Sequence, residues 1–379
     1  MTILLVIILF ILLGRRATIS KSPLQNGSYL AIERTNIINS FFIVFVILRH
    51  AYLPHWDSCL NPLDLLYYKY FDQPAGQSIV STFFFFSGYG IMLSIAKKGD
   101  FYIRKLISHR FLTLYINMAI CSTISGISYS FIDCSLTEGL RFIWLTITGQ
   151  GIYWFIIMTL VIYLSTFFTF RLFGTKNPTK SIIFLSGILY IICLLLSRYK
   201  PSWWVDTELC FCFGMLFSLF RPFIESKLKK VPLPIHWIGA ICLLTGWLLI
   251  LLTYHVQEAL ILAGHKKLIT DGLRIVLLPV SCTIFVLGIA WLTSKLTFKA
   301  PPVFFIWLGG SAVFYLYTLH LIPIRILRAI GWGIHNPEIS ILLTFVASLI
   351  LAYIGSNLIP LIQNRLLFIL RKFCQKANS

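Results

Sequence analysis

The sequence predicts an all-α protein with many membrane-spanning helices. Of its 379 residues, 58% are hydrophobic and 12% are charged, and the mean hydropathy is +0.84, far above what a soluble domain needs. Its apolar runs approach about 20 residues, the length that crosses a hydrocarbon layer about 30 Å thick. Residues 181–197 and 339–351 do not alternate in polarity as barrel strands do. Because a backbone in lipid must satisfy its own hydrogen bonds, helices are expected.

Ten apolar segments are predicted to cross the membrane after a shorter N-terminal one. They cover residues 36–53, 77–96, 111–131, 152–172, 181–197, 207–220, 236–254, 273–292, 303–323 and 339–360. The short segment, residues 1–13, has the length of a signal-peptide core but lacks a basic region before it and a cleavage pattern after it. We expect it to stay attached, either inserted or lying at the interface.

The domain organisation follows from the absence of long linkers between these segments. We predict one membrane domain over residues 34–362. An N-terminal hydrophobic segment with a basic linker, residues 1–33, precedes it. A basic tail, residues 363–379, follows it.

The net charge of +19 is distributed unevenly over the connections. Alternate connections hold most of the 32 Lys and Arg residues together with only three acids, Glu33, Asp100 and Glu225, whereas the remaining connections are balanced. The positive-inside rule places the basic side, including the C-terminus, in the cytoplasm. Topology and contact with membrane lipids therefore account for the charge, and we expect no nucleic-acid partner.

Two histidines stand near the ends of apolar segments almost a whole chain apart. His50 ends the 36–53 segment and His320 lies late in the 303–323 segment, so both are predicted at the extracytoplasmic side. An ionisable residue at membrane depth is costly and is a functional candidate by default. The alternative is a structural hydrogen bond or the interfacial end of a helix.

The run FFFFSGYG, residues 83–90, precedes a basic cytoplasmic loop. Its glycines predict a close approach of two helices. Arg104, Lys105 and Arg110 in the loop suit the phosphates of a cytoplasmic ligand, because arginine forks match phosphate oxygens. Binding of lipid headgroups is the alternative.

Four pieces occur in an order that resembles the membrane acyltransferase-3 family, over about residues 34–360. They are the His50 segment, the Phe-Phe-x-x-Ser-Gly-Tyr segment with its basic loop, Tyr153-Trp154-Phe155, and Gly309-x-Ser311 followed by Tyr317-x-x-His320. The resemblance implies transfer of an acyl group, commonly acetyl, from acyl-CoA to sugars of surface glycans. It also implies a bacterial inner membrane.

The resemblance assigns roles to individual residues. It makes His50, His320 and Tyr317 catalytic, and it gives the CoA contacts to Ser87 and the basic loop. Asn39 and Trp154 are assigned to substrate binding. Asn39 stands where the family usually has an arginine or lysine, 11 residues before the first histidine. The family's Arg-x-x-Arg is replaced here by Arg104-Lys105 with Arg110 further on.

Histidine chemistry suits this reaction, since a base must take a proton from the sugar hydroxyl and histidine titrates in the useful range. His50 is expected to act as that base or to form an acyl-imidazole. The acceptor is a surface polysaccharide or a lipid-linked sugar, the donor is acyl-CoA with acetyl-CoA as the first candidate, and no metal-ligand spacing is present. A flippase or polymerase of lipid-linked glycans is the alternative function; the oligomeric state stays open.

Overall fold

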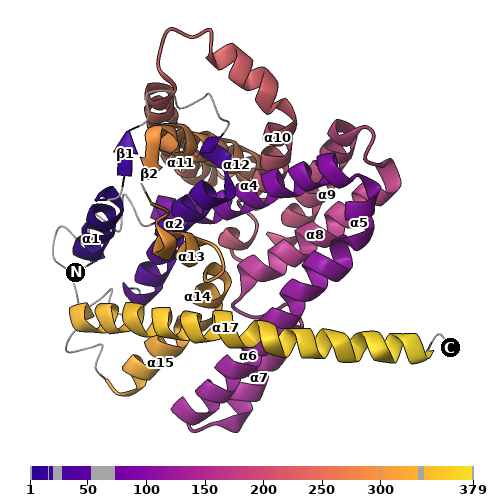
Figure 1. Ribbon diagram of the computed structural model, residues 1–379, viewed down its shortest axis with the longest axis vertical. Coiled ribbons are helices and arrows are strands. Elements are labelled where there is room, and N and C mark those ends of the chain that lie inside the picture. Colours follow the sequence, from indigo (N-terminus) through magenta and orange to yellow (C-terminus); the bar gives the residue numbers. More distant parts are fainter. Residues whose placement is uncertain are drawn as a thin grey trace.

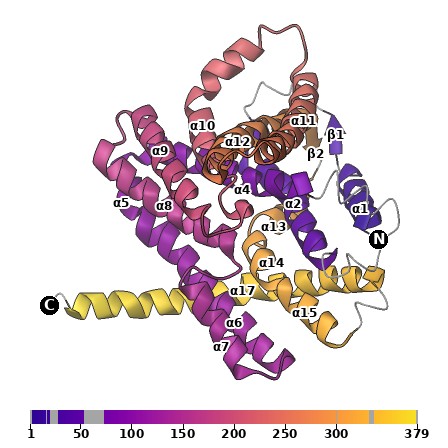
Figure 2. The same ribbon diagram turned by 180° about the vertical axis from the view of Figure 1, so that it is seen from behind.

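The computed structural model describes residues 2–15, 17–19, 28–52, 73–298, 300–331 and 337–377. Almost all of them are helical, as Figures 1 and 2 show from opposite sides. The first half of the chain forms α1 (Thr2–Gly14), α2 (Ile32–Tyr52), α4 (Gln73–Lys98), α5 (Asp100–Leu106), α6 (Leu112–Ile132), α7 (Leu136–Ile147), α8 (Trp154–Phe173) and α9 (Pro178–Leu196). The second half forms α10 (Leu209–Leu228), α11 (Ile235–Leu262), α12 (Lys267–Leu292), α13 (Val303–Gly309), α14 (Val313–Leu319), α15 (Leu321–Ala329) and α17 (Pro337–Ala377).

Short elements connect some of these helices. A π-helical turn, η4 (Ile107–Phe111), joins α5 to α6 without a loop. Among the described residues, the 3-10 turns are η1 (Ser28–Leu30), η5 (Ser202–Trp204) and η6 (Thr293–Lys295). Two strands of three residues, β1 (Ala17–Ile19) and β2 (Leu296–Phe298), pair antiparallel, with Thr18 opposite Thr297.

The all-α membrane class predicted from the sequence is confirmed. Eight helices of the described part are long and apolar enough to cross a membrane, and α13 with α14–α15, bent by 57°, would be a ninth. The remaining predicted segment is α2, a helix of 21 residues that carries Asn39, Arg49 and His50. All ten predicted segments are therefore helical, with eight or nine passing as spans by length and composition.

Glycines set the closest helix contacts, as the small-residue pattern predicts. A Cβ on Gly88 of α4 would meet the carbonyl of Phe211 in α10, and a Cβ on Gly214 of α10 would meet the carbonyl of Phe85 in α4. Gly90, two residues further along α4, has open space around it. The Ser-Gly-Tyr-Gly run thus brings two backbones together through its first glycine.

Helix α7 is an element that the hydrophobic segments do not predict. Ser135 caps it by accepting a hydrogen bond from the backbone N–H of Glu138 at 3.3 Å, the Ser-x-x-Glu pattern of a capping box. Leu136, Leu140 and Trp144 form an exposed apolar stripe along it. A short amphipathic helix of this kind suits the membrane interface.

Helix α17 is 41 residues long and runs across the other helices, extending beyond them at its C-terminal end (Figures 1 and 2). At 1.5 Å per residue it measures about 60 Å. The described residues of the predicted basic tail continue this helix to Ala377. The boundary at residue 362 stays a prediction.

Candidate active site

The two histidines singled out in the sequence are in direct contact. Nδ1 of His50 lies 2.6 Å from Nε2 of His320, and the two rings stack with their centroids 4.9 Å apart. His320 is 1% exposed, whereas His50 is partly exposed. Residues 270 positions apart in the chain therefore form one hydrogen-bonded pair.

The bend between α13 and α14 brings this pair together. α2 packs against α13, α14 and α17, and its first turns meet α13 at Gly309, where a Cβ would collide with the carbonyl of Asn36. The chain then turns by 57°, and His320 follows at the junction of α14 and α15. This arrangement sets His320 against the last turn of α2.

The hydrogen bonds fix the tautomers of the neutral pair. Nδ1 of His320 is 2.8 Å from the backbone carbonyl of Leu316, and a carbonyl only accepts, so Nδ1 carries the proton. Nε2 of His320 is then the acceptor, and Nδ1 of His50 donates to it. Nε2 of His50 is left with its lone pair and has no hydrogen-bond partner among the described residues. An imidazole oriented through its second nitrogen is the usual arrangement of a catalytic base.

Tyr317 lies beside His320. Its ring centroid is 6.4 Å from that of His320 and 5.6 Å from that of Phe155. Its hydroxyl oxygen accepts from the backbone N–H of Phe155 at 3.4 Å. The hydroxyl proton has no acceptor among the residues that the structure describes, so Tyr317 can donate to a bound group.

Tyr153 is a site residue that the sequence motif contained but to which no role was assigned. Its hydroxyl donates to the carbonyl of Thr318 at 2.7 Å and lies 2.9 Å from Oγ of Ser125, so α6 and the start of α8 are tied to α14. The side chain is 1% exposed. Tyr153 therefore holds the turn that carries Tyr317 and His320.

Ser87 contacts Tyr163, and Arg110 lies near the same tyrosine. Oγ of Ser87 lies 3.3 Å from the hydroxyl of Tyr163, and the charge of Arg110 acts on the hydroxyls of both Tyr163 and Tyr102. Arg110 occupies the π-helical turn, a feature often found at functional sites. Two of the four predicted donor contacts thus share one polar cluster.

The other two predicted donor contacts do not join that cluster in the structure. Arg104 and Lys105 are exposed on α5, and the ammonium of Lys105 sits 4.3 Å from the ring centre of Phe101. A guanidinium that the sequence analysis missed faces the other side of the Ser-Gly-Tyr-Gly run. Arg221 donates to the hydroxyl of Tyr89 at 2.6 Å and pairs with Glu225 at 2.7 Å.

The two predicted substrate contacts fall in different places. Asn39 lies three turns before His50 on α2, about 16 Å away along the helix, and its side-chain oxygen is buried without a partner. Trp154 opens α8 and packs against Trp204 of η5, with ring centroids 6.4 Å apart. Trp154 is therefore near the histidine end of the molecule, and Asn39 is not.

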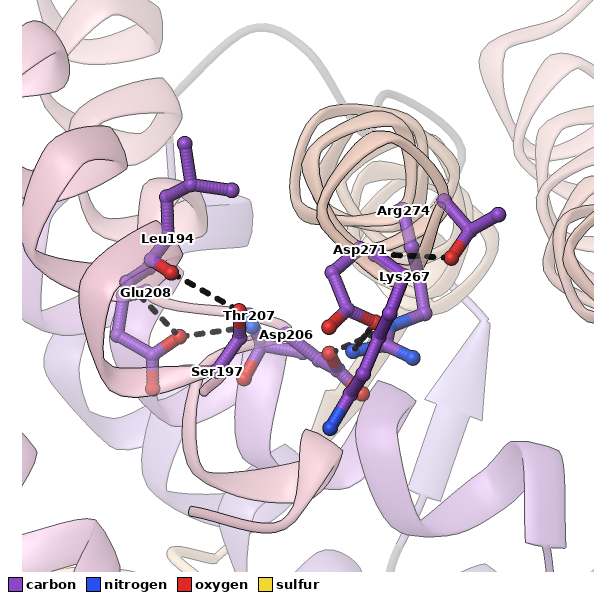
Figure 3. A network of polar contacts seen from close by, with 10 residues as sticks. Leu194, Ser197, Asp206, Thr207, Glu208, Lys267, Asp271 and Arg274 are labelled. Atoms are coloured by element: carbon purple, nitrogen blue, oxygen red, sulfur yellow. Dashed lines mark hydrogen bonds and ion pairs between the residues drawn. The ribbon is translucent and has the colours of Figure 1, made fainter. Parts of the chain in front are cut away.

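A buried ionic network near this end was not anticipated from the sequence (Figure 3). Arg274 of α12 donates to Asp206 at 2.8 Å and pairs with Asp271 at 3.3 Å. All three side chains are at most 5% exposed. Glu208 next to them is fully buried as well. Asp206 and Asp271 lie in or beside apolar runs, and no spacing in the sequence predicts that they pair with Arg274.

In the part of the chain that the structure describes, no group of three His, Cys, Asp or Glu side chains is placed to hold an ion. The site itself offers imidazole, phenol and backbone groups.

The helical architecture and the buried histidine pair define a multi-pass membrane protein with a candidate acid–base site. The family model of acyltransferase 3, described as an acyltransferase domain, matches residues 36–359. The chain belongs to this family and is a membrane acyltransferase, as the resemblance indicated. No curated protein and no solved structure matches the chain.

Proposed function

We propose that this protein transfers an acyl group, acetyl in the first instance, from acyl-CoA to a hydroxyl of a surface polysaccharide or lipid-linked sugar. The observation that carries the proposal is the 2.6 Å contact between His50 and His320 inside a domain of the acyltransferase-3 family. An imidazole that has a free lone pair and is oriented by a second imidazole can act as the general base that removes the proton of a hydroxyl.

The proposed reaction uses Nε2 of His50 as the base. It takes the proton of the sugar hydroxyl while that oxygen attacks the thioester carbonyl carbon. When the carbon–sulfur bond breaks, the imidazolium returns the proton to the thiolate, and the products are an ester and free CoA. Nε2 of His320 accepts the hydrogen bond from Nδ1–H of His50 throughout the reaction. It thereby stabilises the imidazolium, much as a carboxylate does in a triad.

Tyr317 supplies the donor that such a reaction needs at the carbonyl oxygen. Negative charge develops there in the transition state, and a preorganised hydroxyl directed at that position lowers the barrier. The oxygen of Tyr317 is fixed by the N–H of Phe155, which leaves its proton for this purpose.

The donor is proposed to enter from the opposite, cytoplasmic end. Coenzyme A carries several phosphate charges, and the Ser87–Tyr163–Arg110 cluster offers a guanidinium and two hydroxyls to them. The predicted topology puts Arg110 on the basic side, Ser87 and Tyr163 near the middle of their spans, and the histidine pair on the other side. The pantetheine arm would then extend through the bundle between them.

A second route has His50 attack the thioester itself, so that Nε2 carries the acyl group before the sugar arrives. Incubation of the protein with radiolabelled acetyl-CoA without acceptor distinguishes the routes. Label on His50 after rapid quenching supports the acyl-imidazole, and unlabelled protein that still transfers acetyl to glycan supports direct transfer.

The test of the function is mass spectrometry of surface glycans from cells with and without the protein. We expect glycans that differ by the mass of one acyl group per modified hydroxyl. Loss of whole glycans would instead support the flippase or polymerase, and unchanged glycans together with no release of CoA by purified protein would refute the proposal.

A further inference from the structure

We propose that the segment Trp204–Glu208, together with Trp154, forms the subsite that binds the carbohydrate acceptor. This inference rests on the proposed acyl transfer to sugars and names the residues that would hold the sugar. It is carried by three observations: a chain of packed aromatic rings that links the segment to the histidine pair, two fully buried polar atoms without partners, and a rigid ionic support.

The first observation is a continuous path of aromatic contacts from the segment to the histidines. Trp204 packs on Trp154 at 6.4 Å between centroids, and Trp154 contacts Phe155 at 6.2 Å. Phe155 contacts Tyr317, and Tyr317 contacts His320. The indole of Trp204 is therefore four ring contacts from the proposed catalytic pair.

The unpartnered atoms belong to adjacent residues. Oε2 of Glu208 accepts from the backbone N–H of Thr207 at 3.0 Å. Oε1 of Glu208 and Oγ1 of Thr207, by contrast, are buried without any hydrogen-bond partner. Both residues are 0% exposed. A buried polar group without a partner is destabilising. Two such atoms in adjacent residues therefore indicate a place where a ligand supplies the missing hydrogen bonds.

The ionic network holds these atoms in place (Figure 3). Asp206, just before Thr207, is fixed by Arg274, which Asp271 also contacts from one turn earlier on α12. The segment between α9 and α10 is thereby attached to α12 at a buried position. A binding site held by rigid elements and ionic partners is preorganised for its ligand.

The chemistry of the segment fits a sugar better than the coenzyme. A sugar hydroxyl donates to a carboxylate oxygen and exchanges a hydrogen bond with a threonine hydroxyl. The partly exposed indole of Trp154 offers apolar surface to the carbon side of the ring, while the ammonium of Lys200 lies 4.4 Å from the ring centre of Trp204. Asp206 and Asp271 both contact Arg274, and Glu208 adds a third carboxyl group to the segment, so the anionic phosphates of CoA would be disfavoured.

The experiment compares Glu208→Gln and Thr207→Val with the parent protein. Purified protein in lipid vesicles receives acetyl-CoA and surface glycan extracted from cells that lack the protein. We expect Glu208→Gln to raise the KM for glycan by about tenfold, the loss of one hydrogen bond to a charged group, with the KM for acetyl-CoA unchanged. Thr166→Val is the matched control, because this buried threonine bonds the carbonyl of Ile162 in its own helix at 2.7 Å.

The outcomes separate the two proposals. Parent protein that releases no CoA in the presence of glycan refutes the proposed function. Active parent protein with an unchanged glycan KM in both Glu208→Gln and Thr207→Val refutes the subsite alone. If Glu208→Gln does not fold, Thr207→Val and Trp204→Phe decide, and a glycan KM raised in either, but not in Thr166→Val, supports the subsite.

Discussion

The histidine end and the basic end of this protein are built in opposite ways. His50 and His320 are 270 positions apart and share one hydrogen bond, with His320 buried and His50 partly exposed. Arg104, Lys105 and Arg110 lie within seven positions of one another and yet have different surroundings, since only Arg110 joins the cluster of Ser87 and Tyr163. Residues that are close in sequence therefore need not share a site, because α5 continues into the π-helical turn η4 and its side chains change direction there.

The difference reflects what each end is proposed to do. Proton transfer depends on one lone pair held in one direction, which burial and a fixed tautomer provide. Recognition of phosphates depends on accessible positive charge, which tolerates mobile side chains. A substitution at the histidine end should therefore act on kcat, and one at the basic end on the KM of the donor.

The largest effect is expected from His50→Ala. It removes the base, and a positioned base contributes roughly 10² to 10⁴ in rate, so kcat for acyl transfer should fall by at least about 100-fold. Transfer is measured by the release of free CoA thiol in the presence of glycan. Elution of the variant at the parent's position on gel filtration controls for folding. Near-normal acylation by the folded variant would remove His50 from the mechanism.

A smaller loss is expected from His320→Gln, because His50 keeps its lone pair but loses the partner that orients it. We predict a fall in kcat of about 10- to 100-fold with the donor KM unchanged. The double variant with His50→Ala should be no slower than His50→Ala alone, since the two residues act as a unit. Additive losses would show that the histidines act independently.

The close contact of α4 and α10 lies between the two ends, and Gly88→Ala tests it. The added methyl group would meet the carbonyl of Phe211, and overpacking of this kind costs about 1–3 kcal/mol. Gly90→Ala is the matched control, since it has open space and gains helix propensity. Thermal unfolding in detergent should show a lower midpoint for Gly88→Ala alone; equal midpoints would contradict the contact.

The smallest effect is expected at the basic end. Arg110→Gln should raise the KM for acyl-CoA by about three- to tenfold, the value of one charged contact, with the KM for glycan unchanged. Both arginines are exposed, but Arg104→Gln should change this KM less, because Arg104 lies outside the cluster of Ser87 and Tyr163. Neutralising both together with Lys105 without any change in the donor KM would indicate a surface for lipid headgroups instead.

Much of this molecule follows from hydropathy and small motifs. Ten apolar runs predict ten helices, and the glycine after Ser87 predicts a tight crossing, because both signals are local. The short amphipathic helix α7 and the three-residue ladder of β1 with β2 were missed, since the first is too short for a span and the second depends on partners far apart in the chain.

The candidate site was predictable in its members more than in its geometry. The cost of an imidazole in lipid singles out His50 and His320, but only the 57° bend before α14 makes them touch. Asn39 shares a face of α2 with His50 yet lies too far along the helix to reach it. The pairing of Asp206 with Arg274 depends on how α10 meets α12, which no spacing in the sequence reveals.

The short ladder between β1 and β2 has a consequence for the N-terminal helix. Its three residue pairs fasten the stretch after α1 to the stretch after α12, and α1 forms part of the wall of a cavity of about 360 Å³ that is also lined by Phe41 and Leu292. Removing residues 1–19 would take away this part of the wall and leave β2 as a bare edge. Helix α1 and strand β1 are therefore packed against the membrane domain and contribute to its structure.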